Sequence, residues 1–264
     1  MSDSSARRGT VVAFANQKGG VGKSTTAVNL AAALAGMGER MLIVDTDPQS
    51  NATSGVGIDR RIVDHSMYDV FHGGKTIDEV IEPTGIEGLS VVPSSIDLAA
   101  IEIELVARFA RERQLAIALE AMNDDFDFVF IDCPPSLGLI TVNALTAADE
   151  VIIPIQAEYY ALEGLSQLLK SISAIQTNLN PRLEIEGAVI TMYDRRTTLA
   201  LDVSQQVREH FGDRAYRTVI PRTVRLAEAP SFGEPIESFD PLSRGAVAYR
   251  ALAQEFRRRH GRSA

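Results

Sequence analysis

Short runs of apolar residues alternate along this chain with longer segments in which apolar residues recur at helical spacing. Runs rich in valine, isoleucine and phenylalanine predict strands at 10–15, 41–45, 89–93, 127–132, 150–155, 187–191 and 216–220. Segments long enough for helices lie between them, notably at 24–37, 97–122, 162–178, 199–211 and 242–259. Because the strands are apolar on both faces, the pattern predicts a doubly wound α/β fold, with a mostly parallel sheet covered by helices on both faces. Such sheets bind ligands beyond the carboxyl ends of their strands.

The composition favours a single soluble domain. The chain has 264 residues, 45% of them hydrophobic, which suffices for one full core. We predict one domain over residues 1–264, in which residues 1–9 are a disordered tail. No apolar stretch approaches the roughly 20 residues of a membrane span. The single cysteine, Cys133, and the scattered histidines argue against a disulfide, a zinc site or a metal cluster, and suit the reducing cytoplasm.

Charge is distributed unevenly. The net charge is −9, but residues 1–181 carry a balance of −12 and residues 182–264 a balance of +3. Every cationic residue of the second part is an arginine, whose planar fork suits phosphate oxygens. On charge alone, a solvated surface is an equally good interpretation.

The segment "QKGGVGKST", residues 17–25, is the most specific motif in the chain. It follows a predicted strand, opens a predicted helix and matches G-x-x-x-x-G-K-[ST], except that Gln17 stands at the first glycine position. Glycines let backbone N–H groups turn inward around a phosphate at a helix N-terminus. The motif predicts that a nucleotide binds at Gly19, Gly20, Val21, Gly22, Lys23, Ser24 and Thr25. A tight turn without a ligand would not require both lysines.

Carboxylates at the ends of two predicted strands indicate a metal site. Asp132 ends "FVFID", the position expected of an aspartate that reaches Mg²⁺, and Ser24 is the expected hydroxyl ligand. Asp45 and Asp47, in "VDTDPQSN", end the neighbouring strand and are expected in the same crevice. One such aspartate is often only a cap or turn residue, but two beside a phosphate loop favour Mg²⁺. By this reasoning Lys18 remains a surface residue next to a phosphate site.

Four segments together resemble the ParA family of deviant Walker ATPases, which segregate DNA and are related to MinD: "KGGVGKST", "VDTDPQSNAT", "FIDCPPSLG" and "VIPRTVRLAEAPSFGEPI". The resemblance covers about residues 10–256, and "TMYDRRT" at 191–197 is characteristic of the ParA branch. It implies a sheet of seven or eight strands and weak hydrolysis of ATP with Mg²⁺. It further implies an ATP-dependent sandwich dimer, sequence-indifferent binding of double-stranded DNA, and a ParB-type partner with a basic N-terminal segment. The expected location is the nucleoid in the cytoplasm, with no N-terminal helix-turn-helix domain.

The resemblance also assigns residues. Lys18 matches the signature lysine, which would cross the dimer interface to the partner's ATP, so that Lys18, Lys23 and Asp47 form the catalytic set. Asp47 would position the attacking water and, with Ser24 and Asp132, serve the metal. One departure is Ser50, which replaces the usual glycine after "DPQ" and makes the conformation of that turn uncertain.

DNA binding is expected at Arg195, Arg196, Arg222 and Arg225, because the family places arginines that touch the DNA backbone in "RRTT" and "TVRL". Arg222 has an alternative role beside the adenine base, together with Pro221.

Three other functions fit parts of the pattern. A MinD-like membrane ATPase would end in an amphipathic membrane helix, but Leu242, Tyr249, Leu252 and Phe256 have the spacing of core residues. An iron-sulfur carrier needs clustered cysteines, whereas Cys133 stands alone. A ParA-like ATPase that positions a protein cargo shares every motif with a DNA-partitioning one.

Overall fold

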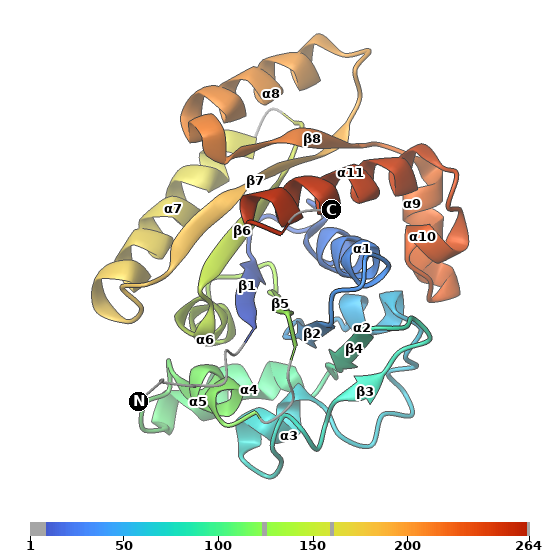
Figure 1. Cartoon of the computed structure of the whole chain (residues 1–264). Helices are drawn as coiled ribbons and strands as arrows, with labels where there is room; N and C mark the ends of the chain where they lie inside the picture. Colours follow the sequence, from blue (N-terminus) through green and yellow to red (C-terminus); the bar gives the residue numbers. More distant parts are fainter. Residues whose placement is uncertain (1–8, 123–125, 159–160, 263–264) are drawn as a thin grey trace, which may run out of the picture.

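The computed structural model describes residues 9–122, 126–158 and 161–262, so the predicted tail lies outside the described residues except for Gly9. Within these residues eight strands form one sheet, in the order β3-β4-β2-β5-β1-β6-β7-β8 (Figure 1). The strands are β1 (Thr10–Phe14), β2 (Met41–Asp45), β3 (Glu82–Pro83), β4 (Leu89–Val92), β5 (Phe128–Asp132), β6 (Glu150–Gln156), β7 (Glu184–Tyr193) and β8 (Ala215–Pro221). All pairs are parallel except β3 with β4. The predicted fold class and the seven predicted strands are confirmed.

Helices cover both faces of the sheet. They are α1 (Lys23–Ala35), α2 (Asn51–Gly55), α3 (Met67–His72), α4 (Leu98–Glu104), α5 (Gln114–Glu120), α6 (Leu139–Ala147), α7 (Ala161–Asn178), α8 (Thr198–Phe211), α9 (Val224–Glu228), α10 (Ile236–Phe239) and α11 (Arg244–Arg259). Short 3₁₀ turns lie at Leu105–Ala107, Gly212–Arg214 and Ala229–Phe232. Among the described residues, we find no helix that could serve as a membrane span.

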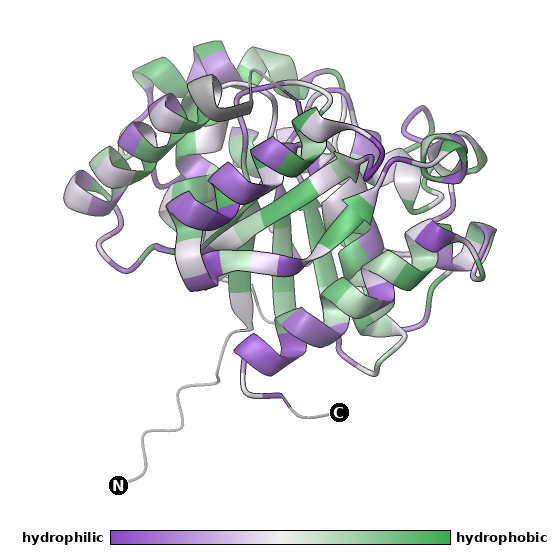
Figure 2. Ribbon diagram, turned by 90° about the horizontal axis from the view of Figure 1, so that it is seen from above, coloured by the Kyte–Doolittle hydropathy of each residue, from purple (hydrophilic) through white to green (hydrophobic). Residues whose placement is uncertain are grey.

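Two hydrophobic cores lie on opposite faces of the sheet. One joins the sheet to α3–α8, and the other joins it to α1, α2 and α9–α11. Successive strand residues point to opposite faces, and β1 shows the consequence: Val11 and Ala13 enter the first core, whereas Val12 and Phe14 enter the second. The inner strands are accordingly hydrophobic along their length, as the hydropathy colours show (Figure 2). Burial on both faces explains why these strands are continuous apolar runs.

The prediction of one helix over 97–122 is wrong. The chain forms α4, a 3₁₀ turn and α5, with an irregular segment before α5 in which Ala110 has a positive φ of 49°. Asn143 of α6 holds this break, because its side-chain amide donates to the Arg111 carbonyl (2.7 Å) and its oxygen accepts from the Leu115 N–H (3.2 Å). A contact from another element therefore replaces the missing helical hydrogen bonds.

The C-terminal helix mostly packs as expected. Tyr249, Leu252 and Phe256 are fully buried in the core that α11 shares with α1. Leu242 precedes the helix and is 89% exposed, so its predicted place in the core is wrong.

The alignment of neighbouring strands places the residues of the candidate site close together. Phe14 of β1 and Asp45 of β2 both lie opposite Asp132 of β5, so these three strands end level with one another. The loop that follows β1 and the carboxylates that end β2 and β5 thus share one edge of the sheet.

Candidate functional site

The glycine-rich loop joins β1 to α1. Gly20 and Gly22 have φ values of 74° and 88°, a left-handed conformation that glycine adopts without strain, and Gly22 is the N-cap of α1. The hydroxyl of Thr191, on β7, donates to the Val21 carbonyl (2.7 Å) and fixes the buried side of the loop. The loop leads directly into the N-terminus of α1, and unpaired N–H groups at a helix N-terminus form an anion site.

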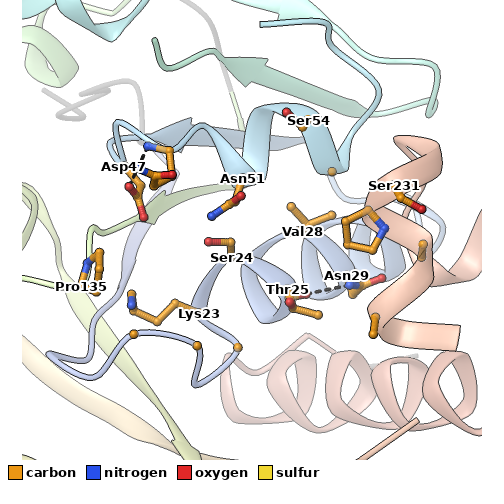
Figure 3. Close-up of a pocket in the computed structure, with 18 of the residues that line it drawn as sticks. Lys23, Ser24, Thr25, Val28, Asn29, Asp47, Asn51, Ser54, Pro135 and Ser231 are labelled. Atoms are coloured by element: carbon orange, nitrogen blue, oxygen red, sulfur yellow. Dashed lines mark hydrogen bonds between the residues drawn. The ribbon is translucent and has the colours of Figure 1, made fainter. Parts of the chain in front are cut away.

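A cavity of about 640 Å³ opens over this loop (Figure 3). The loop and the start of α1 supply Gly19, Gly20, Gly22, Lys23, Ser24 and Thr25. Three of the predicted nucleotide-binding residues do not line the cavity: Val21, a loop residue whose side chain is buried, and Pro221 and Arg222. The volume is within the usual range for a small-molecule site.

Sequence reasoning missed the opposite wall of the cavity. Asn51 and Ser54 come from α2, and Met192, Pro230 and Ser231 come from later parts of the chain. Asn51, Met192, Pro230 and Ser231 lie within the segments that carry the family resemblance, which could have indicated them, but the sequence analysis assigned them no role. Helix α2 packs on α1, and the turn at Ala229–Phe232 packs on α2, whereas Met192 is placed by strand β7 of the sheet.

The carboxylates behind Lys23 have different partners. Asp45 is fully buried and accepts hydrogen bonds from the Thr53 N–H (2.8 Å), the Thr53 hydroxyl (2.7 Å) and the Asp47 N–H (3.1 Å). Burial raises its pKa to about 6, against these hydrogen bonds. Asp45 thus anchors α2 to the sheet and does not line the cavity, although the sequence suggested that it would share the crevice.

Asp132 is also fully buried, but neither of its carboxylate oxygens has a hydrogen-bond partner among the described residues. Burial raises its pKa well above the usual value and the neighbouring negative charge of Asp45 adds to this, while Ser24 and Lys23 act in the opposite direction. A buried carboxylate without a partner is costly unless a cation completes it.

These groups fit Mg²⁺. The ion is bound through one or two carboxylates, hydroxyls, waters and substrate phosphates. Ser24 and Asp47 line the cavity, whereas Asp132 does not line it but is buried close enough to Ser24 and Lys23 for both to lower its pKa. In the described part of the chain no three His, Cys, Asp or Glu residues form a metal-ligand cluster. The donor set therefore suits a metal shared with a nucleotide and does not form a closed protein cage.

The two lysines of the loop have different surroundings. Lys23 is 6% exposed and lines the cavity, and burial lowers its pKa, opposed by Asp132, Cys133 and Asp47. Lys18 does not line the cavity; its Nζ pairs with Glu158 at 3.3 Å. Cys133 is a free, buried residue.

Ser50, which stands where the family usually has glycine, has a left-handed backbone conformation. Its φ and ψ are 55° and 37°, which is left-handed, and it is the N-cap of α2. A left-handed residue other than glycine is strained. The structure therefore has the backbone that the usual glycine would favour, with a fully buried serine in it.

The predicted DNA-binding arginines gather around a second cleft, of about 570 Å³, at the carboxyl end of β8. Arg195, Arg196 and Arg222 line it, together with Arg244, which sequence reasoning missed. Arg225 lies on α9 beside this cleft and pairs with Asp240 (2.8 Å) and Glu228 (3.1 Å). Arg196 is paired with Asp194 (2.7 Å), and these hydrogen bonds lower the pKa of Asp194 to about 2.

A doubly wound sheet with a glycine-rich loop, a buried lysine and a strand-ending aspartate defines the class of P-loop nucleotide-binding proteins. The family model for the AAA domain matches residues 9–185. The sporulation initiation inhibitor protein Soj of Bacillus subtilis is 54% identical over 94% of this chain and 98% of its own length. The chromosome partitioning protein ParA of Caulobacter vibrioides is 51% identical over 93% of this chain and 92% of its own length. The chain belongs to the ParA/Soj family of partitioning ATPases.

Solved structures agree with this assignment. A structure described as cobyrinic acid a,c-diamide synthase from Mycobacterium smegmatis, with bound ADP and magnesium, has a TM-score of 0.82 at 40% identity and covers 94% of both chains. The cell division ATPase MinD of Pyrococcus furiosus has a TM-score of 0.76 at 28% identity, covering 95% of this chain and 99% of its own. The fold is thus shared with nucleotide-bound proteins of the superfamily.

Proposed function

We propose that this protein is an ATP-dependent DNA-partitioning ATPase that works as a dimer at the nucleoid. ATP and Mg²⁺ are its cofactors. The proposal rests on the contrast between the two lysines of one loop. Lys23 lines the cavity, whereas Lys18 lies outside it and pairs with Glu158. We infer that, in a nucleotide site that includes both lysines, Lys18 comes from a second protomer.

The chemistry at one protomer follows from its buried groups. Lys23 would neutralise charge on the β- and γ-phosphates, while Ser24 and Asp132 would hold Mg²⁺. Asp47 lines the cavity, and its Oδ1 accepts from the Gln49 N–H (2.9 Å), so that it is oriented to position the attacking water. Lys18 of the second protomer supplies the additional positive charge that phosphoryl transfer needs.

DNA binding is the second part of the proposal. Arg195, Arg222 and Arg244 line the cleft at the end of β8 and are exposed, and no carboxylate of the described residues forms an ion pair with them. Together with Arg196 and Arg225 they form an arginine cluster on an acidic protein. Contacts of this kind go to phosphates and are indifferent to sequence.

A ParB-type partner completes the cycle. Residues 1–181 carry a balance of −12, which favours a basic segment of another protein. Docking of that segment would raise a weak intrinsic rate of hydrolysis and release DNA.

The decisive experiment measures binding of a fluorescent DNA duplex without nucleotide, with ADP and with ATP, each with Mg²⁺. We expect at least tenfold tighter binding with ATP, equally for duplexes of unrelated sequence. Binding that ignores the nucleotide would contradict coupling between the two clefts. A protein that dimerises with ATP but binds no DNA would support the alternative of a protein cargo.

The membrane alternative gains no support from α11. A membrane-inserting helix needs an apolar face that is free, whereas Tyr249, Leu252 and Phe256 fill the core. Pelleting with anionic lipid vesicles tests the same point, and we expect the protein to stay in the supernatant.

A further inference from the structure

A second arginine-lined cleft, of about 500 Å³, lies at the opposite end of β8 from the cleft described above. Arg208 reaches it from α8, Arg217 from β8, and Arg258 and Arg259 from the end of α11. Strand β8 is the edge strand of the sheet, and α8 and α11 cover its two faces (Figure 1). The cleft therefore opens on the outer edge of the molecule, between the two helical layers.

Arg259 and Glu255 form the fixed part of this cleft. The Arg259 guanidinium lies 3.9 Å from the centre of the Tyr216 ring and donates to the carbonyls of Asp213, Arg214 and Ala215. Glu255 accepts from the N–H groups of Arg217 (2.8 Å) and Thr218 (2.9 Å) and so protects the free edge of β8. These two side chains are occupied by the protein itself.

The outer arginines of this cleft are free of carboxylate partners among the described residues. Arg208, Arg217 and Arg258 are exposed, and no carboxylate of the described residues pairs with them. By contrast, Arg196, Arg225 and Arg250 each pair with a carboxylate, as close as 2.7 to 2.8 Å. Four arginines and two acidic residues, Asp213 and Glu255, line this cleft, and a third acidic residue, Glu186, lies 3.5 Å from Arg259. It is thus an electropositive site on a protein of net charge −9.

We propose that this cleft is a second contact site for the phosphate backbone of double-stranded DNA, used together with the first cleft. The inference rests on the proposed DNA-binding function and extends its footprint. Both clefts lie along one edge, linked by β8, whose residues between Arg217 and Arg222 carry no charge.

A duplex is long enough to span the distance between the two clefts. Arg222, just past the end of β8, lies five positions after Arg217, or roughly 17 Å along the strand at about 3.3 Å per residue. Successive phosphates of one DNA strand advance by about 3.4 Å along the axis, so the same span corresponds to about five base-pair steps. Strand β8 connects the two clefts, and arginine forks match phosphate oxygens at both ends.

The test compares Arg217→Ala, Arg258→Ala and the double variant in the full chain, by fluorescence anisotropy with a long mixed-sequence duplex, ATP and Mg²⁺. Arg182→Ala is the matched control, because Arg182 is also exposed and has no carboxylate partner among the described residues. Each cleft substitution should weaken binding about five- to tenfold at 0.1 M salt and lower the salt slope of the dimer by roughly two units. Thermal unfolding and ATP binding should match the wild type.

The outcomes separate this site from the function on which it rests. If the wild type binds DNA and Arg222→Ala weakens that binding, but the Arg217 and Arg258 variants behave like Arg182→Ala, the second site is refuted and the function stands. If the wild type binds no DNA in any nucleotide state, the proposed function fails, and this site with it. If polyglutamate, and not DNA, requires Arg217 and Arg258, the cleft binds an acidic protein and the proposal is wrong.

Discussion

Lys18 and Lys23 lie on the same loop but experience different surroundings, and that difference is testable. Lys18→Ala leaves the cavity of its own protomer intact, since Lys18 does not line it. We expect normal ATP binding, no ATP-dependent dimer in sedimentation, and hydrolysis reduced by about 100-fold or more, as for loss of one charge-stabilising donor in other enzymes.

The matched control for this prediction is Lys75→Ala. Lys75 also pairs with a glutamate, Glu79, at 3.2 Å, but it lies far from the loop in sequence and does not line the cavity. It should dimerise and hydrolyse ATP as the wild type does. A Lys18→Ala protein that forms a normal ATP-dependent dimer would remove the argument for a shared active site.

Ser50 offers a test of backbone strain. Glycine at this left-handed position should relieve about 1–2 kcal/mol of strain, but it also gains about 0.4–1 kcal/mol of conformational freedom in the unfolded chain. The two effects oppose one another. We therefore expect Ser50→Gly to change the free energy of unfolding by no more than about 1.5 kcal/mol, with stabilisation as the favoured sign.

A branched residue at the same position gives the contrast. Ser50 is fully buried, so Ser50→Val adds both backbone strain and excess volume and should destabilise the protein by more than about 2 kcal/mol. Denaturant unfolding of both variants measures these differences. Equal stability of the glycine and valine variants would show that the turn rearranges.

At the scale of elements, the end of α11 is held to β6 by a hydrogen bond between His260 and Glu150, which depends on the protonation of the histidine. His260 Nε2 lies 2.9 Å from Glu150 Oε2 on β6, and its Nδ1 lies 2.9 Å from the Phe256 carbonyl. Burial alone would lower the pKa of His260, but these hydrogen bonds and the charge of Glu150 raise it above its usual value. The charge of Glu186 also raises the pKa of His260. Arg259 lies 3.5 Å from Glu186, and its positive charge opposes that of Glu186.

The contribution of the His260–Glu150 contact to the stability of the fold should therefore depend on pH. A histidine whose pKa is raised in the folded state contributes stability that is complete below its unfolded pKa and is lost as the pH rises through the folded one. His260→Gln should therefore cost about 1.5–3 kcal/mol near pH 6 and less at pH 8.5, measured by unfolding at both values. His210→Gln is the control, because His210 is exposed at the end of α8 and has no carboxylate partner among the described residues. A cost that does not vary with pH would mean that His260 acts only by packing.

Elements also differ in how far their sequences predict them. Strand β5 is an unbroken apolar run because both its faces are buried, and its local pattern suffices. The segment 97–122 has a helical pattern at both ends, yet Asn143 stabilises a break within it. The two-residue strand β3 exists only because β4 lies beside it. Such features depend on partners that are distant in sequence, and local periodicity cannot predict them.

At the level of the whole molecule, hydrolysis should depend on three components at once. We expect the isolated protein to turn over ATP slowly, and a short basic peptide to raise the rate only when DNA is also present. The physical reason is that a cation is attracted to the acidic first part of the chain, at −12, while DNA occupies the arginine-rich edge. A phosphate-release assay with and without a long duplex measures this.

The control peptide has the same length with its lysines and arginines replaced by glutamates, and it should have no effect. Fast hydrolysis by the protein alone, or equal stimulation without DNA, would contradict this coupling. A rate that DNA raises by itself would place the stimulus at the arginines.

By itself the sequence determined the alternating elements, the phosphate loop and the strand-ending aspartates, because each depends on residues close together in the chain. Tertiary structure decided the rest. It pairs Lys18 with Glu158, 140 positions away, and it commits Asp45 to Thr53 while leaving Asp132 without a partner. It also places arginines at both ends of β8. These arrangements depend on which helices pack on which face of the sheet, and side-chain contacts through space carry no local signal that a sequence pattern could show.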